Sequence, residues 1–374
     1  MKKKKILMFF LLFLIIFITI GFIFVNAFLS KVNYTDWSNT THISEEEVIQ
    51  EIIKEEETNE DLKDLEEVKP EDVIIETVNP LDSIPNISNI LLVGEENYYN
   101  DARGRTDSMM ILTIDKINGT LKLTSIMRDS YVTIPNYQDN RINAAYAIGG
   151  IPLLKETIET NYGITIDNTA LVNFEAFQKI IDILGGVDIE LTAAEAKYLN
   201  SNNYIKEEEN RNVIEGVNHF NGSQALGYAR IRKVKEIDGE SNDFGRTSRQ
   251  RRVLSTLFNE YKSASLPTLL ELANKILPYI TTDMSKDEII DYITAIVFMA
   301  PDEIETFRLP IDKGYTNVSI RGMSVLQINW ETNRNALKEF IYGITLEESI
   351  DTIETNSINT IEDINTNTIE NTIQ

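Results

Sequence analysis

The order of apolar segments along the chain predicts a layered α/β domain. Runs rich in aliphatic and β-branched residues at 90–93, 109–114 and 121–126 have the length and composition of buried strands. Further along, strand-like runs alternate with stretches of helical character, which is typical of domains in which helices cover a sheet. With 374 residues, 42% of them apolar, the chain can bury a large core.

Local signals justify the individual elements. The turn-like Lys116-Ile117-Asn118-Gly119 separates the second strand from the third. Pro152 opens a helix over 152–160, and Gly185-Gly186 closes a helix over 175–184. We also expect strands at 170–173 and 187–191, a helix from the Ser285–Glu288 capping box to about 298, and a last helix over 324–342.

The first 29 residues are interpreted as a membrane anchor. Residues 1–5 contain four lysines, and residues 6–29 contain no charged side chain. A helix of 24 residues is ~36 Å long, enough to cross a ~30 Å hydrocarbon core with some tilt. Lysines stay in the cytoplasm, so we expect a single-pass cell-membrane protein with its C-terminal domain outside. A cleaved signal peptide is the alternative, although its apolar region is usually only ~7 to 15 residues.

Two acidic segments flank the expected domain at 89–345, which includes the C-terminal helices. Residues 31–89 carry 17 acidic side chains against 4 lysines, so 30–88 is interpreted as a stalk, with a short amphipathic helix available around Val48 and Ile52. Residues 346–374 carry 7 acidic side chains and no basic one, and are interpreted as a disordered tail. Most of the net charge of −24 therefore belongs to the flanks.

The composition excludes several chemistries. The chain has no cysteine, which rules out disulfides, thiolate metal sites and cysteine nucleophiles. It has two histidines, His42 and His219, and no HExxH run, which argues against a serine hydrolase triad or a zinc protease. The chemistry must therefore come from arginines and carboxylates.

The segment 227–233 carries the first candidate site. In an extended conformation Tyr228, Arg230 and Arg232 would share one face. Two guanidinium groups at that spacing repel each other unless an anion lies between them, and a diphosphate would accept bonds from both. The alternative is an exposed strand whose arginines are solvated or paired with carboxylates.

A second basic segment follows at 243–254, where we expect a helix to begin. Arg246 and Gln250 are four residues apart and so lie on one face, with Arg249 close by. Residues 230–252 hold eight basic side chains against four acidic ones. Nucleic acid would suit such a patch, but the expected topology places it on the wrong side of the membrane. A solvated helix face is the other alternative.

Arginine and carboxylate also occur together at two strand ends. Arg103-Gly104-Arg105-Thr106-Asp107 precedes the second strand, and Arg128-Asp129 follows the third, in positions where functional groups concentrate. Asp107, with the Glu95-Glu96 pair after the first strand, offers hard oxygen ligands for a Mg²⁺ that keeps most of its waters and bridges to phosphate. Structural ion pairs between these neighbours are the alternative.

Eight motifs in order resemble the LytR-CpsA-Psr family of cell-envelope enzymes, from about 89 to 257 and more weakly to 342. The motifs are Asn-Ile-Leu-Leu-Val-Gly at 89–94, Arg-Thr-Asp-Ser-Met-Met at 105–110, Ser-Ile-Met-Arg-Asp at 125–129, Arg-Ile-Asn-Ala-Ala-Tyr at 141–146, Val-Asn-Phe at 172–174, Ile-Asp-Ile-Leu-Gly-Gly-Val at 181–187, Ala-Leu-Gly-Tyr-Ala-Arg-Ile-Arg-Lys at 225–233 and Gly-Arg-Thr-Ser-Arg-Gln-Arg at 245–251. The resemblance implies an αβα domain with a central mixed sheet, preceded by one membrane helix, in a Gram-positive type of envelope.

The resemblance also implies an activity. Such a protein would move a glycopolymer, of the teichoic acid or capsular polysaccharide type, from an undecaprenyl diphosphate carrier onto peptidoglycan through a phosphodiester. The matching residues that would grip the diphosphate are Arg105, Arg128, Arg230, Arg232 and Gln250, with Arg246 as a further arginine and Arg103 and Arg249 as weaker candidates. Asp107 matches a ligand of Mg²⁺, or of Mn²⁺ in its place, and Glu96 stands where the family usually has an aspartate.

Physical chemistry supports this mechanism. Attack on phosphorus builds negative charge, which arginines and Mg²⁺ would stabilise. Asp129 or Asp107 is the candidate general base, and 174–184 would line an apolar channel for the lipid. Two other classes stay open: a hydrolase of the same lipid-linked donor, in which water replaces the sugar acceptor, and an envelope-related regulator or attenuator that binds nucleic acid.

Overall fold

The computed structural model describes residues 32–38, 40, 43–56, 62, 64–96 and 106–343. The expected anchor at 6–29 with its tail at 1–5, the acidic tail at 346–374, and the candidates Arg103 and Arg105 lie outside these ranges. Within them, no helix combines the length and the apolar character that a membrane span requires.

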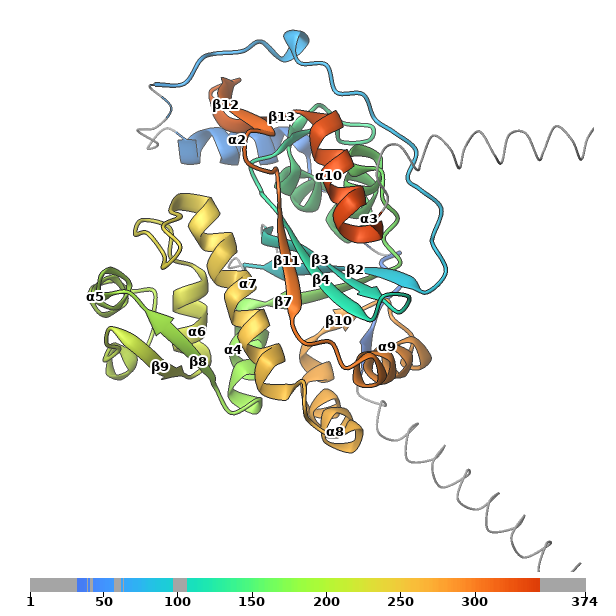
Figure 1. Cartoon of the computed structure of the whole chain (residues 1–374). Coiled ribbons are helices and arrows are strands. Elements are labelled where there is room, and N and C mark those ends of the chain that lie inside the picture. The colour runs from blue at the N-terminus through green and yellow to red at the C-terminus, as the bar shows by residue number, and fades with distance from the viewer. Residues whose placement is uncertain are drawn as a thin grey trace, which may run out of the picture.

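A seven-stranded mixed sheet forms the centre of the domain (Figure 1). Its strands, in spatial order, are β1 (Asn33–Tyr34), β10 (Thr281–Thr282), β7 (Asn168–Asn173), β2 (Ile87–Glu95), β3 (Thr106–Asp115), β4 (Thr120–Ile126) and β11 (Ile304–Leu309). β3 runs antiparallel to β2 and β4, whereas β7 is parallel to β2 and β11 is parallel to β4. The α/β class with a mixed central sheet is confirmed.

Helices cover both faces of this sheet (Figure 1). One face carries α2 (Glu45–Glu56), α3 (Ile142–Tyr162) and α10 (Trp330–Tyr342), and the other carries α4 (Phe174–Ile183), α6 (Gly222–Ala229), α7 (Asn242–Tyr261), α8 (Leu266–Ile276) and α9 (Lys286–Met299). The alternation along β2 explains this: Leu91 and Val93 join the core under α3, while Ile90 and Leu92 join the cluster under α7 and α9.

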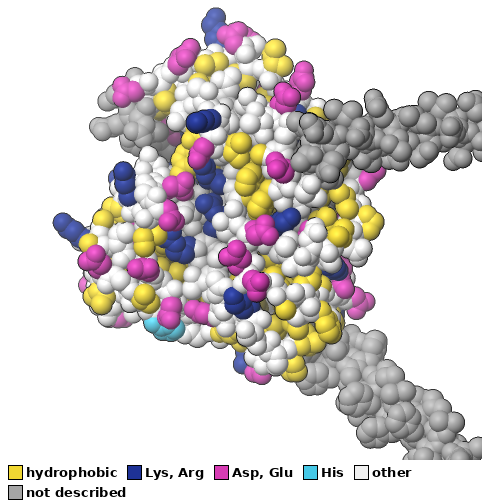
Figure 2. All heavy atoms as spheres, viewed as in Figure 1, with side chains coloured by type: hydrophobic (Ala, Val, Ile, Leu, Met, Phe, Trp, Pro, Cys, Tyr) yellow, Lys and Arg dark blue, Asp and Glu magenta, His cyan; other side chains and the backbone are white. Residues whose placement is uncertain are grey.

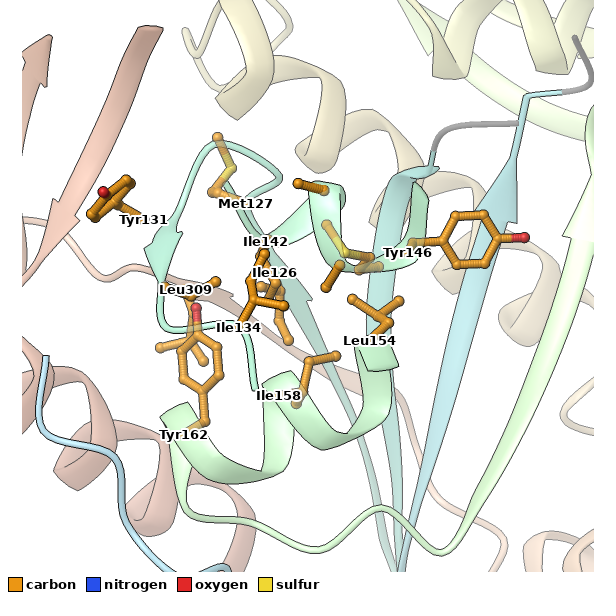
Figure 3. Close-up of a cluster of buried hydrophobic side chains, with 14 of the residues drawn as sticks. Ile126, Met127, Tyr131, Ile134, Ile142, Tyr146, Leu154, Ile158, Tyr162 and Leu309 are labelled. Atoms are coloured by element: carbon orange, nitrogen blue, oxygen red, sulfur yellow. The ribbon is translucent and has the colours of Figure 1, made fainter. Parts of the chain in front are cut away.

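The largest apolar core lies between the sheet and α3 (Figure 3). It includes Tyr162 of α3, whose ring meets that of Trp330 of α10 edge to face at 5.2 Å between centroids. The predicted helix at 152–160 is the second half of α3, which begins ten residues earlier. Gly150 (φ 65°, ψ −153°) breaks the helical backbone just before Pro152, so the proline does start a helical stretch.

Three two-stranded sheets and one more helix complete the domain: β5 (Tyr131–Val132) with β6 (Asn140–Arg141), β8 (Val187–Leu191) with β9 (Gly216–Phe220), β12 (Tyr315–Ile320) with β13 (Met323–Ile328), and α5 (Ala193–Ser201). The helix predicted over 324–342 is wrong in its first part. Residues 323–328 form β13, because they alternate buried and less buried side chains and pair antiparallel with β12.

The described part of 30–88 does not stand apart as a stalk. β1 pairs with β10 in the main sheet, and α2 packs its apolar face against α3 and β13. Val48 and Ile52, four residues apart on that face, are only 3% and 2% exposed. The acidic residues dominate the composition, but the helical spacing of a few apolar ones decides the packing.

Candidate active site

A cavity of about 1150 Å³ lies between the sheet and helices α4, α6 and α7. One end is polar and is lined by Asp107, Arg128, Asp129, Arg232, Asp243 and Arg246. The other end is apolar and is lined by Leu92, Met110, Val172, Phe174, Phe177, Ile180, Ile181, Val253, Leu254, Leu257 and Ile280. Figure 2 shows basic side chains in a hollow near the middle of this face. The cavity therefore has the polarity of a lipid with a charged head.

Strand ends and one helix start bring the polar residues together. Asp107 lies at the beginning of β3, and Arg128 and Asp129 come one residue after the end of β4. Asp243 and Arg246 lie in the first turns of α7, so their side chains, three residues apart, share a face. The edge of a sheet thus meets the N-terminus of a long helix, where the helix dipole also favours an anion.

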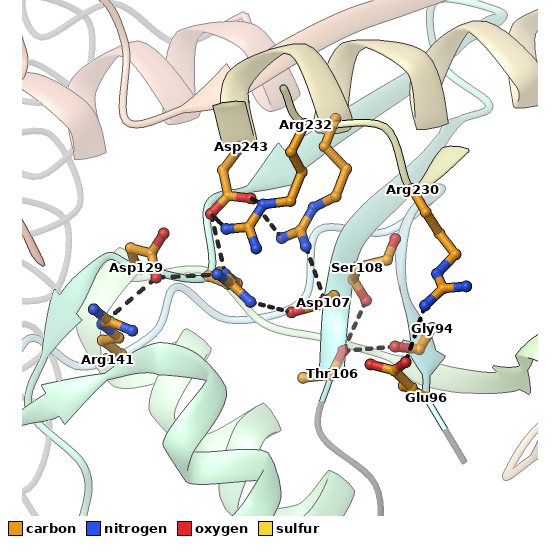
Figure 4. A network of polar contacts seen from close by, with 12 residues as sticks. Gly94, Glu96, Thr106, Asp107, Ser108, Asp129, Arg141, Arg230, Arg232 and Asp243 are labelled. Carbon is orange, nitrogen blue, oxygen red and sulfur yellow. Dashed lines mark hydrogen bonds and ion pairs between the residues drawn. The ribbon is translucent and has the colours of Figure 1, made fainter. Parts of the chain in front are cut away.

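Three arginines share two carboxylates at this end (Figure 4). Asp107 accepts from Arg128 Nη1 at 2.6 Å and from Arg246 Nη1 at 2.8 Å. Asp243 accepts from Arg128 Nε at 3.1 Å and from Arg246 Nη2 at 3.1 Å. Arg232 adds a bidentate fork to Asp243, with its Nε and Nη2 both 2.7 Å from the carboxylate oxygens. Asp129 approaches Arg128 Nε at 3.5 Å, so the three arginines meet three carboxylates, of which Asp129 makes the longest contact.

The extended conformation predicted for 227–233 is wrong. Residues 222–229 form α6, because Asn221 and Gln224 make a capping box that starts a helix there. Arg230 and Arg232 consequently point to different partners: Arg230 donates to Glu96 at 3.2 Å and stacks on the Phe174 ring at 4.8 Å. Both arginines line the cavity, but they do not flank one anion. Pairing with carboxylates, the alternative expectation, describes them better.

The two candidate bases have opposite acidities. Burial opposes the charge of Asp107, but Arg246 and Arg128 outweigh burial and hold its pKa below the usual range. Burial raises the pKa of Asp129 to about 6, helped by the neighbouring Asp243 carboxylate and opposed by Arg128 and Arg141. Asp129 can therefore exchange a proton near neutral pH, whereas Asp107 stays ionised.

Two candidate residues on α7 differ in their position relative to the cavity. Gln250 lines the cavity and donates from Nε2 to the carbonyl of Ala229 at 3.4 Å. Arg249 is fully buried, pairs with Glu195 at 2.8 Å and donates to the carbonyls of Ile231 and Val234. Arg249 thus holds the loop that carries Arg230 and Arg232.

Sequence reasoning missed two residues of the site. Asp243 is the carboxylate that three arginines share, and its signal was the Asp-x-x-Arg spacing at the start of the expected helix. Arg141 is 3% exposed, pairs with Glu56 at 2.6 Å and approaches Asp129 at 3.5 Å. Its only signal was its place in a matched motif, because Glu56 lies 85 residues away.

The carboxylates do not form a metal cage. Among the described residues, no three histidine or acidic side chains gather as a metal-binding group. Glu96 is engaged by Arg230, and each oxygen of Asp107 accepts from an arginine. A carboxylate oxygen has a second lone-pair position, so Asp107 fits a Mg²⁺ whose remaining ligands are phosphate oxygens and water.

Fold and site define a class of protein: a layered α/β domain whose sheet edge carries an arginine–carboxylate cluster at the head of an apolar cavity. The chain belongs to the LytR_cpsA_psr family, whose model matches residues 47–340. The resemblance found in the sequence is thereby confirmed, and the match begins inside α2 rather than at 89.

Two relatives extend this comparison at the level of sequence identity. The chain is 33% identical over 256 residues to "Regulatory protein MsrR" of Staphylococcus aureus (strain COL), covering 67% of this chain and 73% of that protein. It is 34% identical over 180 residues to "Polyisoprenyl-teichoic acid--peptidoglycan teichoic acid transferase TagV" of Bacillus subtilis (strain 168), covering 47% and 44%.

Solved structures agree on the fold. The crystal structure of B. subtilis TagV superposes with a TM-score of 0.56 at 27% identity, covering 69% of this chain and 98% of that one. "TagT bound to LIIa-WTA" superposes with a TM-score of 0.55 at 24% identity, covering 72% and 97%. At that identity the second match supports the fold alone.

Proposed function

We propose that the protein is a phosphotransferase that moves a glycopolymer, of the teichoic acid or capsular polysaccharide type, from an undecaprenyl diphosphate carrier onto peptidoglycan through a phosphodiester. It acts outside the cell membrane, held there by the apolar segment 6–29. Its family membership and the transferase name of the TagV relative support this proposal.

One observation carries the proposal: the cluster of Arg128, Arg232 and Arg246 lies in a cavity that also has a wall of apolar side chains from β2, β3, β7, α4 and α7. A prenyl diphosphate has the same division between a charged head and a long hydrocarbon tail. Guanidinium forks suit phosphate oxygens, and apolar walls suit the tail. A nucleic acid would instead favour an exposed basic surface, and these arginines are enclosed with carboxylates.

The transfer step follows from this arrangement. The oxygen of an acceptor hydroxyl attacks the phosphorus that bears the glycopolymer, and the bond from that phosphorus to the bridging oxygen breaks. The lipid monophosphate leaves with the bonding electrons, and the hydroxyl proton passes to Asp129. Arg128, Arg232 and Arg246 stabilise the charge that grows on the phosphate oxygens, and because they are already positioned, little reorganisation is needed. The arginines must exchange part of their bonding from Asp243 to phosphate.

Bound Mg²⁺, or Mn²⁺ in its place, would neutralise diphosphate charge, with Asp107 as its protein ligand. Glu96 reaches a metal only after leaving Arg230, so we assign it a secondary part. Arg230 stacks on the ring of Phe174 and so holds the loop that follows α6 in place beside the substrate.

Purified full-length protein with a lipid-linked donor and peptidoglycan tests the proposal. We expect Arg232→Ala to lower kcat/KM about 10³-fold, or ~4 kcal/mol of transition-state stabilisation, while the melting temperature stays within a few degrees, because the Arg232 side chain is 37% exposed. Lys262→Ala, on an exposed lysine at the end of α7, is the control. Full activity of Arg232→Ala would overturn the assignment.

Product analysis separates the two enzyme classes. Transfer yields glycopolymer bound to peptidoglycan, whereas hydrolysis of the same donor yields free phosphorylated glycopolymer. Release of free product at the same rate with and without peptidoglycan would favour the hydrolase.

A further inference from the structure

The most exposed aromatic side chains of the described residues lie on neighbouring elements. Tyr34 of β1 is 60% exposed, Tyr279 of η4 (Leu277–Tyr279) is 41% exposed, and Phe298 of α9 is 80% exposed. β1 pairs with β10, which directly follows η4 and precedes α9. We call this patch, with the α8 and α9 side chains around it, the α8–α9 surface. Figure 2 shows hydrophobic side chains gathered at the lower right, where Figure 1 places these helices.

Helix α9 has an uneven distribution of charge. Its four charged residues, Lys286, Asp287, Glu288 and Asp291, lie in its first two turns, and residues 292–299 carry no charge. Within residues 292–299, Tyr292, Ile296 and Met299 pack toward the sheet and Ile293 packs toward α8, whereas Phe298 is 80% exposed. A phenylalanine that faces water at the uncharged end of a helix indicates a contact surface.

The apolar end of the cavity reaches this surface. Ile280 lines the cavity and is the next residue after Tyr279, and Leu257 lines it from α7. Helix α8 packs against both α4 and η4, and so closes the same end from outside. The apolar end of the cavity and the α8–α9 surface are therefore neighbours in the fold.

The chain also fixes what can cover the surface. Val32, the first described residue, packs against the cluster of Ala273, Leu277 and Ile289 between α8 and α9. The apolar run ends at Leu29, three residues earlier, and three extended residues reach at most ~11 Å. If 6–29 crosses a bilayer, the bilayer surface therefore lies within ~11 Å of the α8–α9 surface.

We propose that the α8–α9 surface docks on the lipid bilayer, with Tyr34, Tyr279 and Phe298 in the interface. Tyrosine suits that position because its ring is apolar and its hydroxyl is polar. Asp291 is paired with Lys116, and the start of α9 carries Lys286 beside Asp287, so the surface has no excess of basic side chains for anionic headgroups. The contact is therefore apolar and insensitive to salt. The purpose of this docking rests on the proposed function: it would let the prenyl tail enter the cavity without crossing water. Exposing that tail to water would cost ~0.8 kcal/mol per CH₂.

Because the chain has no cysteine, single labels test the docking directly. Full-length Phe298→Cys carries an environment-sensitive fluorophore and is reconstituted into neutral phosphatidylcholine vesicles that contain brominated lipid. Val217→Cys on β9, 66% exposed and on the opposite side of Figure 1, is the matched control, and Phe17→Cys reports on the anchor. We expect quenching of at least twofold at 298 and 17, little at 217, and no change at 0.5 M salt. Tyr279→Cys replaces Phe298→Cys if the latter fails to fold.

Each other result contradicts the proposal in its own way. Quenching at 17 but not at 298 or 279 means that the surface faces water. If no position is quenched, both the membrane anchor and the docking are contradicted. A disulfide-linked dimer of Phe298→Cys in detergent, without lipid quenching, means that a second copy covers the surface. None of these results depends on transfer activity, so they leave the enzymatic proposal to its own assay.

Discussion

Two arginines three residues apart on α7 serve opposite purposes. Arg249 points into the domain, where Glu195 and the carbonyls of Ile231 and Val234 each accept one of its nitrogen donors. Arg246 points into the cavity, where it divides its donors between Asp107 and Asp243, which other arginines also use. The first network is closed, because each acceptor serves Arg249 alone. The second network is open, because three arginines share Asp243 and two of them also share Asp107.

The difference shows that arginines have a structural role in one network and are placed for a functional role in the other. Neither Arg249 nor Glu195 has exposed side-chain surface, so their mutual attraction must offset the desolvation of both charges. In the second network the Arg246 side chain is only 4% exposed, but its neighbours Arg232 and Asp107 keep 37% and 26% of their side chains exposed. Charge that is shared and reachable from the cavity is available to a ligand, whereas paired and enclosed charge holds the backbone in place.

Breaking the closed network should have the largest effect. Glu195→Ala leaves the Arg249 guanidinium buried without its anion, and we expect it to lower the free energy of unfolding by about 3–5 kcal/mol. Urea unfolding in detergent measures this, with Glu190→Ala on exposed β8 as the control, expected within about 0.5 kcal/mol. A double variant, Glu195→Leu with Arg249→Met, should recover most of the loss. A change below 1 kcal/mol in Glu195→Ala would contradict the structural role.

Removing a charge from the second network should reduce activity more than stability. Asp243→Asn keeps the shape of the side chain but removes the charge that orients Arg128, Arg232 and Arg246. We expect kcat/KM to fall about 10²-fold, or ~2.7 kcal/mol, with a smaller loss of stability than in Glu195→Ala. Asp238→Asn, on an exposed partner of Arg252, should change the rate less than about twofold. Equal rates for both variants would remove Asp243 from the site.

The pH profile should give the smallest effect of the three. Since burial raises the pKa of Asp129 to about 6, its carboxyl is protonated below that pH and cannot accept the hydroxyl proton. The rate should therefore rise with pH through about 6 and be about tenfold lower at pH 5 than on the plateau. Asp129→Asn should lower the rate and flatten this limb. A limb that persists in Asp129→Asn would assign it to another group.

The sequence predicts the sheet better than its surroundings, for a physical reason. Strand patterns at 90–93, 109–114, 121–126 and 170–173 are local, and each run lies within a strand of the main sheet. The pairing of β1 with β10 involves two residues on each side and joins Asn33 to Thr281, 248 positions apart, so no local pattern announces it. Likewise, 323–328 is a strand because β12 pairs with it, not because of its own spacing.

The site shows the same limit. Arg128, Asp129, Arg246 and Asp107 were found as charged residues at element ends, where the structure does bring them together. The direction of Arg230 was not predictable, because it depends on whether 225–229 is helical, and the Asn221–Gln224 capping box decides that. Glu56 was hidden in an acidic segment, and only the packing of α2 brings it to Arg141.

The order of the strands in the sheet has a consequence for folding during synthesis. Four of the five inner strands, β7, β2, β3 and β4, are complete once residue 173 has been synthesised, whereas the fifth, β10, begins at 281 and the edge strand β11 at 304. β1, near the start of the chain, must wait for β10 before it has a partner in the sheet. Contacts so distant in sequence form slowly, so β1 has no partner in the sheet until most of the domain has been synthesised.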